Sequence, residues 1–369
     1  MEIMKNTTLL AASLAVGATG AYAGGMDRSG MSISPLFEDG TYVELSFGSV
    51  SPDVSGAFNH PLAGELPSGD VTPSYTQISG AYKRDLSDQL SMALIIDQPY
   101  GADIDYGSDA SYPIAGSYAS VTTSSITALL RYKFNENFSV YGGARVLRSE
   151  GEVELYSSGT KFYEMNTSSE TDWGYIVGAA YEIPDIALRA SLTYSSEIDI
   201  DFTADEVSAL GANSSDLPVT MPKSVNFNFQ TGIAADTLLM FSARWAEWTE
   251  TEIAPDDYLL IVGDNLVDHD NDTISYSLGV GRRFNDKWSG SLSVGYEKSY
   301  LGSTDTAGNL SPRDGYKSIT AGLKYNVTEQ TAISGGVSYV WVGDATTSLG
   351  GEFEDNTAVG FGLKLSHTF

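Results

Sequence analysis

Apolar side chains recur at every second position in many short segments of this chain. Near the middle of the sequence, for example, Leu188, Ala190 and Leu192 alternate with Arg189 and Ser191. Residues two apart lie on the same face of a strand, so this period predicts strands with one apolar and one polar face. The segments with this pattern number about fourteen, and they span residues 41–50, 74–84, 90–98, 120–134, 137–149, 172–182, 186–198, 223–234, 236–249, 273–283, 288–299, 316–325, 331–342 and 357–369.

The connections between these segments alternate in length. Those after even-numbered strands have about five residues or fewer, whereas those after odd-numbered strands have roughly 13 to 25, as in transmembrane barrels with short turns on one side and long loops on the other. A soluble all-β protein is the alternative, but nothing in a β-sandwich requires such regular alternation. We therefore predict an all-β fold, a transmembrane antiparallel barrel of about 14 strands over residues 41–369 of an outer-membrane protein.

Residues 1–23 have the features of a secretory signal peptide. Lys5 precedes a stretch of apolar and small residues, and Ala21-Tyr22-Ala23 matches a cleavage site. An N-terminal anchor helix is the alternative. The apolar run falls well short of the roughly 20 residues that a membrane span requires, so we favour the signal peptide.

Composition excludes several functions. The chain has no cysteine among 369 residues, which excludes disulfide scaffolds and thiolate metal sites. Its 48 acidic and 20 basic residues give a formal charge of −28, which opposes a nucleic-acid partner. The only histidines, His60, His269 and His367, form no recognisable catalytic constellation. We expect neither an enzyme nor a cofactor.

The connection 250–272 is strongly acidic and has no basic residue other than His269. A solvated loop explains this pattern, and a calcium site or a metal site that bridges lipopolysaccharide is the alternative. Five tryptophans, at positions 173, 245, 248, 288 and 341, fall near strand ends. Their positions suit the aromatic girdles at membrane interfaces.

The segment 217–250, LPVTMPKSVNFNFQTGIAADTLLMFSARWAEWTE, resembles a signature of the FadL-type (OMPP1/FadL/TodX) outer-membrane transporters of long-chain fatty acids and hydrophobic compounds. The residues that match it are Pro222, Ser224, Gly232, Trp245 and Trp248. Residues 97–106, 129–146 and 183–194 also resemble this family. The resemblance implies a monomeric, plugged, fourteen-stranded barrel in a Gram-negative outer membrane that takes up long-chain fatty acids or other hydrophobic molecules passively. A general porin for small hydrophilic solutes remains the alternative.

Family members carry an N-terminal hatch inside the barrel. Here only residues 24–40 lie between the signal peptide and the first strand, so the resemblance implies a short plug that closes the lumen less completely. Asp27, Arg28 and Pro35 belong to this segment, and Ser34-Pro35-Leu36 stands where the family has Asn-Pro-Ala.

A fatty acid requires an apolar groove and one well-placed cation, preferably arginine. If the polar strand faces point inward, the candidates for the carboxylate site are Arg131, Arg145, Arg189 and Arg244. Ion-pair networks in the barrel interior are the alternative role for these residues.

The long connections 150–171 and 199–222 carry apolar side chains. In the family, the corresponding loops form a groove that collects substrate, and the candidates here are Tyr156, Phe162, Tyr163, Met165, Phe202 and Leu210. Simple packing between loops is the alternative. The sequence TADEVSAL also predicts a short helix with Thr203 as its N-cap.

In the family, a kink in the third strand opens the wall so that cargo leaves sideways into the membrane. Pro99 and Gly101 are the candidates for such a kink, because proline lacks a ladder donor and glycine weakens a strand. Alternatively, they end the strand in a loop.

The chain ends in an alternating strand whose last residue is Phe369. This ending resembles the C-terminal pattern that the barrel assembly machinery recognises, and it predicts pairing between the last and first strands. Lipopolysaccharide and outer-membrane lipid are the other expected partners.

Overall fold

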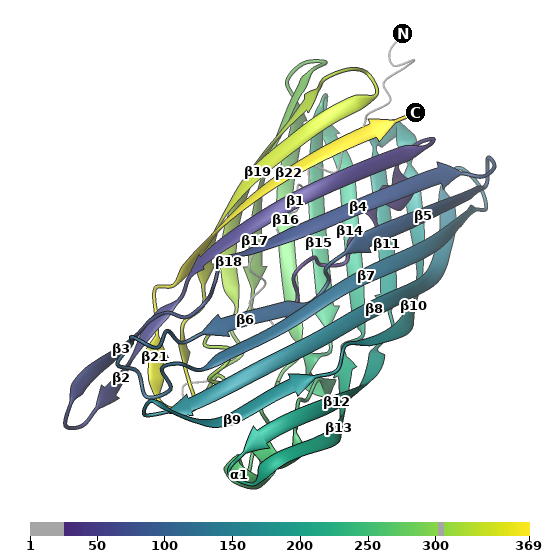
Figure 1. The fold of residues 1–369 in the computed structure, drawn as a ribbon. Helices are drawn as coiled ribbons and strands as arrows, with labels where there is room; N and C mark the ends of the chain where they lie inside the picture. The colour runs from purple at the N-terminus through teal and green to yellow at the C-terminus, as the bar shows by residue number, and fades with distance from the viewer. Residues whose placement is uncertain (1–25, 302–305) are drawn as a thin grey trace, which may run out of the picture.

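The computed structural model describes residues 26–301 and 306–369, which form a closed antiparallel barrel (Figure 1). The predicted signal peptide, residues 1–23, lies outside the described residues, as do residues 24 and 25 of the predicted plug. None of the described helices has the length and apolar character needed to cross a membrane.

Fourteen strands form the wall in the described part of the chain, and the third of them is split in two. In order around the barrel they are β1 (Tyr42–Asp53), β4 (Tyr75–Asp85), β5 (Leu90–Asp97) with β6 (Gly101–Asp105), β7 (Tyr118–Lys133), β8 (Phe138–Ser157), β10 (Glu170–Ile183), β11 (Leu188–Ser195), β14 (Ser224–Ala234), β15 (Thr237–Ala246), β16 (Thr273–Arg283), β17 (Trp288–Glu297), β18 (Tyr316–Asn326), β19 (Thr331–Val342) and β22 (Thr357–Thr368). The last strand closes on the first, with Thr368 opposite Tyr42 and Thr357 opposite Asp53. Closure pairs both outer edges, as a bilayer requires. The prediction of an antiparallel barrel of about fourteen strands is confirmed.

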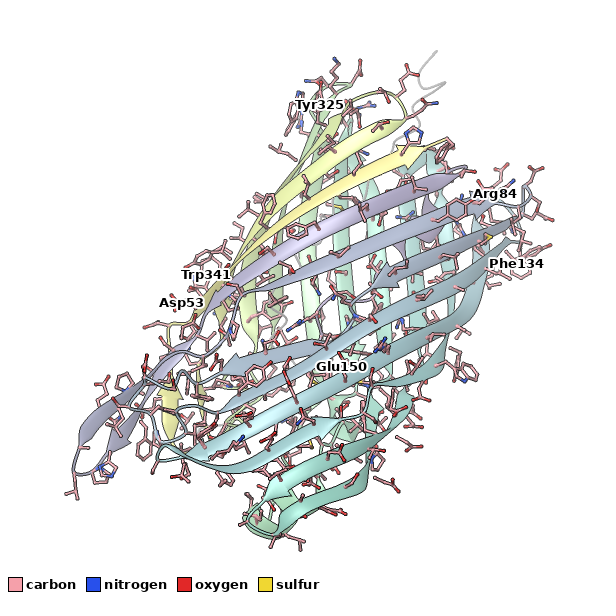
Figure 2. The ribbon with its side chains drawn as sticks, in the orientation of Figure 1. Asp53, Arg84, Phe134, Glu150, Tyr325 and Trp341 are labelled. Carbon is pink, nitrogen blue, oxygen red and sulfur yellow. The ribbon has the colours of Figure 1, made fainter. Side chains whose placement is uncertain are left out.

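The two faces of the wall differ as the period of two predicts. On β22, Leu363 and Leu365 are exposed on the outside, whereas Lys364 and Ser366 are buried toward the lumen. Aromatic side chains border this apolar surface: Figure 2 labels exposed Phe134 and half-buried Tyr325 near the end that carries the C-terminus and exposed Trp341 farther along the wall. The girdle prediction is wrong for Trp248, which is fully buried.

The end of the barrel opposite the C-terminus carries most of the remaining structure (Figure 1). The additional strands there are β2 (Ser55–His60), β3 (Gly64–Asp70), β9 (Thr160–Thr167), β12 (Ile198–Ser208), β13 (Gly211–Met221), β20 (Ala345–Thr346) and β21 (Gly351–Phe353). The described helices are η1 (Ser34–Phe37) before β1, η2 (Pro184–Ile186) in the short turn between β10 and β11, and η3 (Trp248–Glu250) and α1 (Asp256–Val262) in the connection between β15 and β16. The long connections therefore fold into hairpins and a helix above the lumen.

The predicted helix at Thr203 is wrong, because this segment belongs to strand β12. Buried Ile200, Phe202 and Ala204 alternate there with exposed residues. This period of two, together with eleven cross-strand pairs to β13, outweighs the local preference of a Thr-Ala-Asp-Glu start for a helix.

Candidate functional site

Residues 26–40, here called the N-terminal segment, lie inside the lumen and contact strands on several sides of it. Both carboxylate oxygens of Asp27 accept hydrogen bonds of 2.9 Å from the Nε and Nη2 atoms of Arg244 on β15, and both side chains are buried. The Nδ2 of Asn226 on β14 donates to the carbonyl of Gly30 at 2.9 Å. Ser29 donates to Asp97 at the end of β5, at 2.8 Å. These contacts hold the segment across the bore.

The second half of the N-terminal segment packs against an apolar cluster on the lumen wall. Pro35 and Leu36 of η1 are buried, and Leu36 joins an apolar cluster with inward-facing side chains that include Ala93, Leu129 and Ile176. Apolar burial and buried polar contacts thus act together to fix the segment.

The third strand breaks between Asp97 and Gly101, where Pro99 lies. Both halves of the strand pair with β7. On the other side, the described part of β4 pairs with β5 only over residues 80–85, so residues 75–79 of β4 have no ladder to β6. The wall ladder therefore has a gap between β4 and β6, which hydrogen bonds between Gln98 and residues 77 and 78 of β4 bridge in part.

The N-terminal segment covers this gap. Gly101 N–H donates to the carbonyl of Met26, and Arg28 N–H donates to the carbonyl of Pro99, each at 2.8 Å. Arg28 also pairs with Asp103 at 2.5 Å and lies over the Tyr75 ring at 4.2 Å. A Cβ at Gly101 would lie 2.7 Å from the Arg28 guanidinium, so the absence of a side chain there allows the close approach.

The four arginines that the sequence analysis selected all contact the N-terminal segment. Arg244 binds Asp27, and Arg145 contacts the sulfur of Met31. Arg131, which also pairs with Glu182, and Arg189 each lie 4.6 Å from the Phe37 ring. Among the described residues that line the large cavity of the molecule, none is one of these four.

That cavity, of about 580 Å³, lies between the N-terminal segment and the long connections. The predicted loop residues Tyr156, Phe162, Met165 and Phe202 line it. Two others do not: Tyr163 is buried beside the cavity and donates to Glu206, while Leu210 is 60% exposed at the end of the β12–β13 hairpin. The volume is within the range of about 300–1,000 Å³ typical of small-molecule sites.

Among the polar side chains of the cavity, Arg313 and His269 had no predicted site role. Arg313 lines the cavity, and its burial lowers its pKa. Burial, followed by the positive charge of Arg313, lowers the pKa of His269 to about 4, so this imidazole is neutral at pH 7. Arg313 is the only basic residue from 299 to 316, and that isolation was the one available signal.

Comparison with known proteins places the chain. The model of the family described as outer membrane protein transport protein (OMPP1/FadL/TodX) matches residues 36–365. The protein belongs to this family. It is an outer-membrane β-barrel transport protein, and the family is not one of enzymes. Membership favours a transporter of hydrophobic compounds over a general porin.

Individual relatives are distant in sequence. The long-chain fatty acid transport protein of Salmonella typhi is 22% identical over 368 residues, which cover 88% of this chain and 82% of the relative. The crystal structure of a Pseudomonas aeruginosa FadL homologue superposes with a TM-score of 0.75 at 15% identity, covering 95% and 96% of the two chains. The Ralstonia pickettii toluene transporter TbuX superposes at 0.65, with 12% identity and 90% of each chain covered. These two structures show a shared fold.

The acidic connection 250–272 raised the alternative of a metal site. In the described ranges, no group of three or more histidine, aspartate and glutamate side chains is arranged to hold a metal ion.

Proposed function

We propose that this protein takes up long-chain fatty acids or similar hydrophobic molecules through the outer membrane without an energy source. The observation that carries the proposal is the apolar-lined cavity, which meets the N-terminal segment where that segment covers the wall gap. The Salmonella typhi relative is named for transport of long-chain fatty acids. The binding, exit and partner roles below extend this proposal, which includes no catalytic step.

The carboxylate of a fatty acid would bind at Arg28 and Arg313, the two arginines among the described residues that line the cavity. Guanidinium groups bind carboxylates through charge-assisted, often bidentate hydrogen bonds. The remaining lining includes Phe, Tyr, Met, Leu and Val side chains that suit an acyl tail, together with aspartate and glutamate side chains such as Asp264, Asp268 and Glu297. Arg131, Arg145, Arg189 and Arg244 then act through the N-terminal segment, which serves as the plug.

The exit would be the gap between β4 and β6. Displacement of residues 26–28 removes the two backbone hydrogen bonds that cover the break at Pro99 and Gly101. An apolar molecule that leaves sideways enters the hydrocarbon of the membrane and avoids water, which favours this direction.

Other partners follow from position. Outer-membrane lipid and lipopolysaccharide would surround the exposed apolar belt. Phe369, at the end of the closing strand, would be recognised by the barrel assembly machinery. We propose a monomer, in which each barrel works alone.

Binding of labelled oleate and toluene to the purified protein in lipid nanodiscs tests the proposal. Arg313→Gln removes one cavity cation, so oleate affinity is expected to fall about tenfold, the loss of roughly 1.5 kcal/mol for a charge-assisted hydrogen bond. Toluene affinity is expected to stay unchanged. Arg148→Gln, at an exposed arginine, is the matched control. If neither probe binds the native protein, the cavity is not a transport site.

A further inference from the structure

The connection between β15 and β16 passes over the cavity. We call its residues 251–272 the strap. Ile253, Tyr258, Leu266 and Val267 of the strap line the cavity, and Ile253 is tied to Val267 by a β-bridge within the strap. The strap follows β15 after η3 and leads directly into β16, and its residues, α1 among them, do not pair in the wall ladder.

A buried carboxylate holds α1 against the neighbouring hairpin. Glu206 on β12 is 1% exposed. Its Oε2 accepts hydrogen bonds from the N–H groups of Asp257 and Tyr258 at 3.1 and 3.3 Å and from the Tyr163 hydroxyl at 2.8 Å. Its Oε1 accepts from the Ser215 hydroxyl at 3.2 Å. Glu206 thus joins α1 to β9, β12 and β13.

A second carboxylate lies on α1 itself and accepts hydrogen bonds from the hairpin. Asp257 on α1 is 5% exposed. It accepts hydrogen bonds from the Ser208 hydroxyl at 2.6 Å and from the Asn213 amide at 3.1 Å, both on the β12–β13 hairpin. We call Glu206 and Asp257, with these partners, the latch.

Polar contacts supply much of what holds α1 down. Tyr258 packs against the Tyr163 ring at 5.2 Å, but Leu260 is 76% exposed, and Ile261 and Val262 are exposed as well. Water replaces a hydrogen bond at small net cost, whereas separated apolar surfaces find no such substitute. A segment held by a polar latch and anchored at both ends in a rigid wall can open without disturbing the barrel.

We propose that the strap is a lid over the cavity and that the Glu206–Asp257 latch must open for a hydrophobic molecule to reach the cavity from outside. The inference rests on the proposed function, because it takes this cavity as the transport site. The hairpin and α1 lie together at the end of the barrel opposite the C-terminus (Figure 1), where a molecule from the medium arrives.

An engineered disulfide tests the lid directly, because the native chain has no cysteine. Ser208→Cys with Asp257→Cys replaces a 2.6 Å hydrogen bond by a covalent link between β12 and α1. The matched control is Asp205→Cys with Ser214→Cys, which links the directly paired β12 and β13 and leaves α1 unattached. Oleate and toluene uptake are measured in cells before and after reduction.

We expect the oxidised Ser208–Asp257 pair to lower uptake at least tenfold, with recovery on reduction, while the control pair shows no redox effect. Equal uptake in both redox states of the Ser208–Asp257 pair overturns the lid. If the native protein transports neither probe, the proposed function fails, and the lid is judged by a readout that does not need transport.

Hydrogen exchange of the Asp257 and Tyr258 amides supplies that readout. Glu206→Gln removes the charge that accepts both N–H groups, so exchange of these amides is expected to accelerate at least tenfold. Asp205→Asn, at an exposed neighbour on the same strand, is expected to leave exchange unchanged. Equal exchange in the native protein and Glu206→Gln contradicts the latch.

Discussion

A single buried ion pair positions the start of the N-terminal segment in this barrel. Asp27 and Arg244 are both buried and bonded through two parallel hydrogen bonds. Removing water from both charges is costly, so such a pair adds little net stability, but loss of one partner leaves an uncompensated buried charge. The pair therefore fixes where the segment sits more than it stabilises the barrel.

Arg244→Ala is expected to release the start of the N-terminal segment. The uncompensated Asp27 costs about 3–5 kcal/mol, so the segment leaves its site more often and ions pass. Conductance in planar bilayers is expected to rise, and Asp27→Ala with Arg244→Ala is expected to leak less than the single variant. Conductance equal to that of the native protein would refute this role.

The lowered pKa of His269 predicts that the docking of the strap depends on pH. Its pKa in the docked strap is about 4, against an ordinary value of 6.5. Between these pH values a released strap binds a proton that the docked strap does not, so docking weakens as pH falls from 6.5 to 4, by up to about 3 kcal/mol. Above pH 6.5 no effect is expected.

Quenching of Trp248 by acrylamide measures this release, because its ring packs 5.4 Å from His269. With the other four tryptophans replaced by phenylalanine, quenching is expected to increase as pH falls through this window. His269→Phe is expected to remove the increase. A pH-independent signal in the parent variant would show that His269 stays docked when protonated.

At the scale of elements, the third strand is the most informative. Its break at 98–100 leaves a gap that residues 26–28 cover through backbone hydrogen bonds. Gly101 permits this contact, because the Arg28 guanidinium occupies the space of a side chain.

Gly101→Val is expected to push the flexible end of Arg28 away from Asp103 and out of the cavity. The barrel is expected to fold normally, while oleate affinity falls roughly three- to tenfold because a cavity cation is displaced. Gly107→Val is the control, since a Cβ there has no neighbour within 4 Å. Equal oleate affinity in both variants would remove Arg28 from the binding site.

The period of two predicted the wall because membrane and lumen impose opposite polarity on alternate residues. The same period continues in β9 and β12, which lie beyond the wall and pair with each other. The sequence analysis assigned these residues to long loops, so it did not predict the hairpins. The interior was less predictable. Arg313 reaches the cavity from a loop, and Arg244 meets Asp27 from 217 positions away, contacts that no local pattern specifies.

At the scale of the whole molecule, the width of the lumen explains why the barrel holds an internal plug. Barrels of about 8 strands are filled by their own side chains, whereas those of 16–18 leave an aqueous channel. This barrel lies between the two, and residues 26–40 occupy its lumen.

Deletion of residues 26–37 is expected to leave a folded barrel with a hydrated bore, since the wall ladder does not include these residues. Liposome swelling in arabinose is expected to rise well above that of the native protein. Heat-modifiable mobility in gels checks that the barrel has assembled. Swelling unchanged in an assembled barrel would mean that other residues seal the lumen.

Uptake of labelled oleate tests the central claim most directly. Cells that lack their own fatty acid transporter are compared with and without this protein, with arabinose uptake measured in parallel. A transporter of hydrophobic molecules whose lumen is occupied by residues 26–40 predicts a gain in oleate uptake and no gain in arabinose uptake. Arabinose uptake without a gain in oleate would contradict the account and indicate a porin.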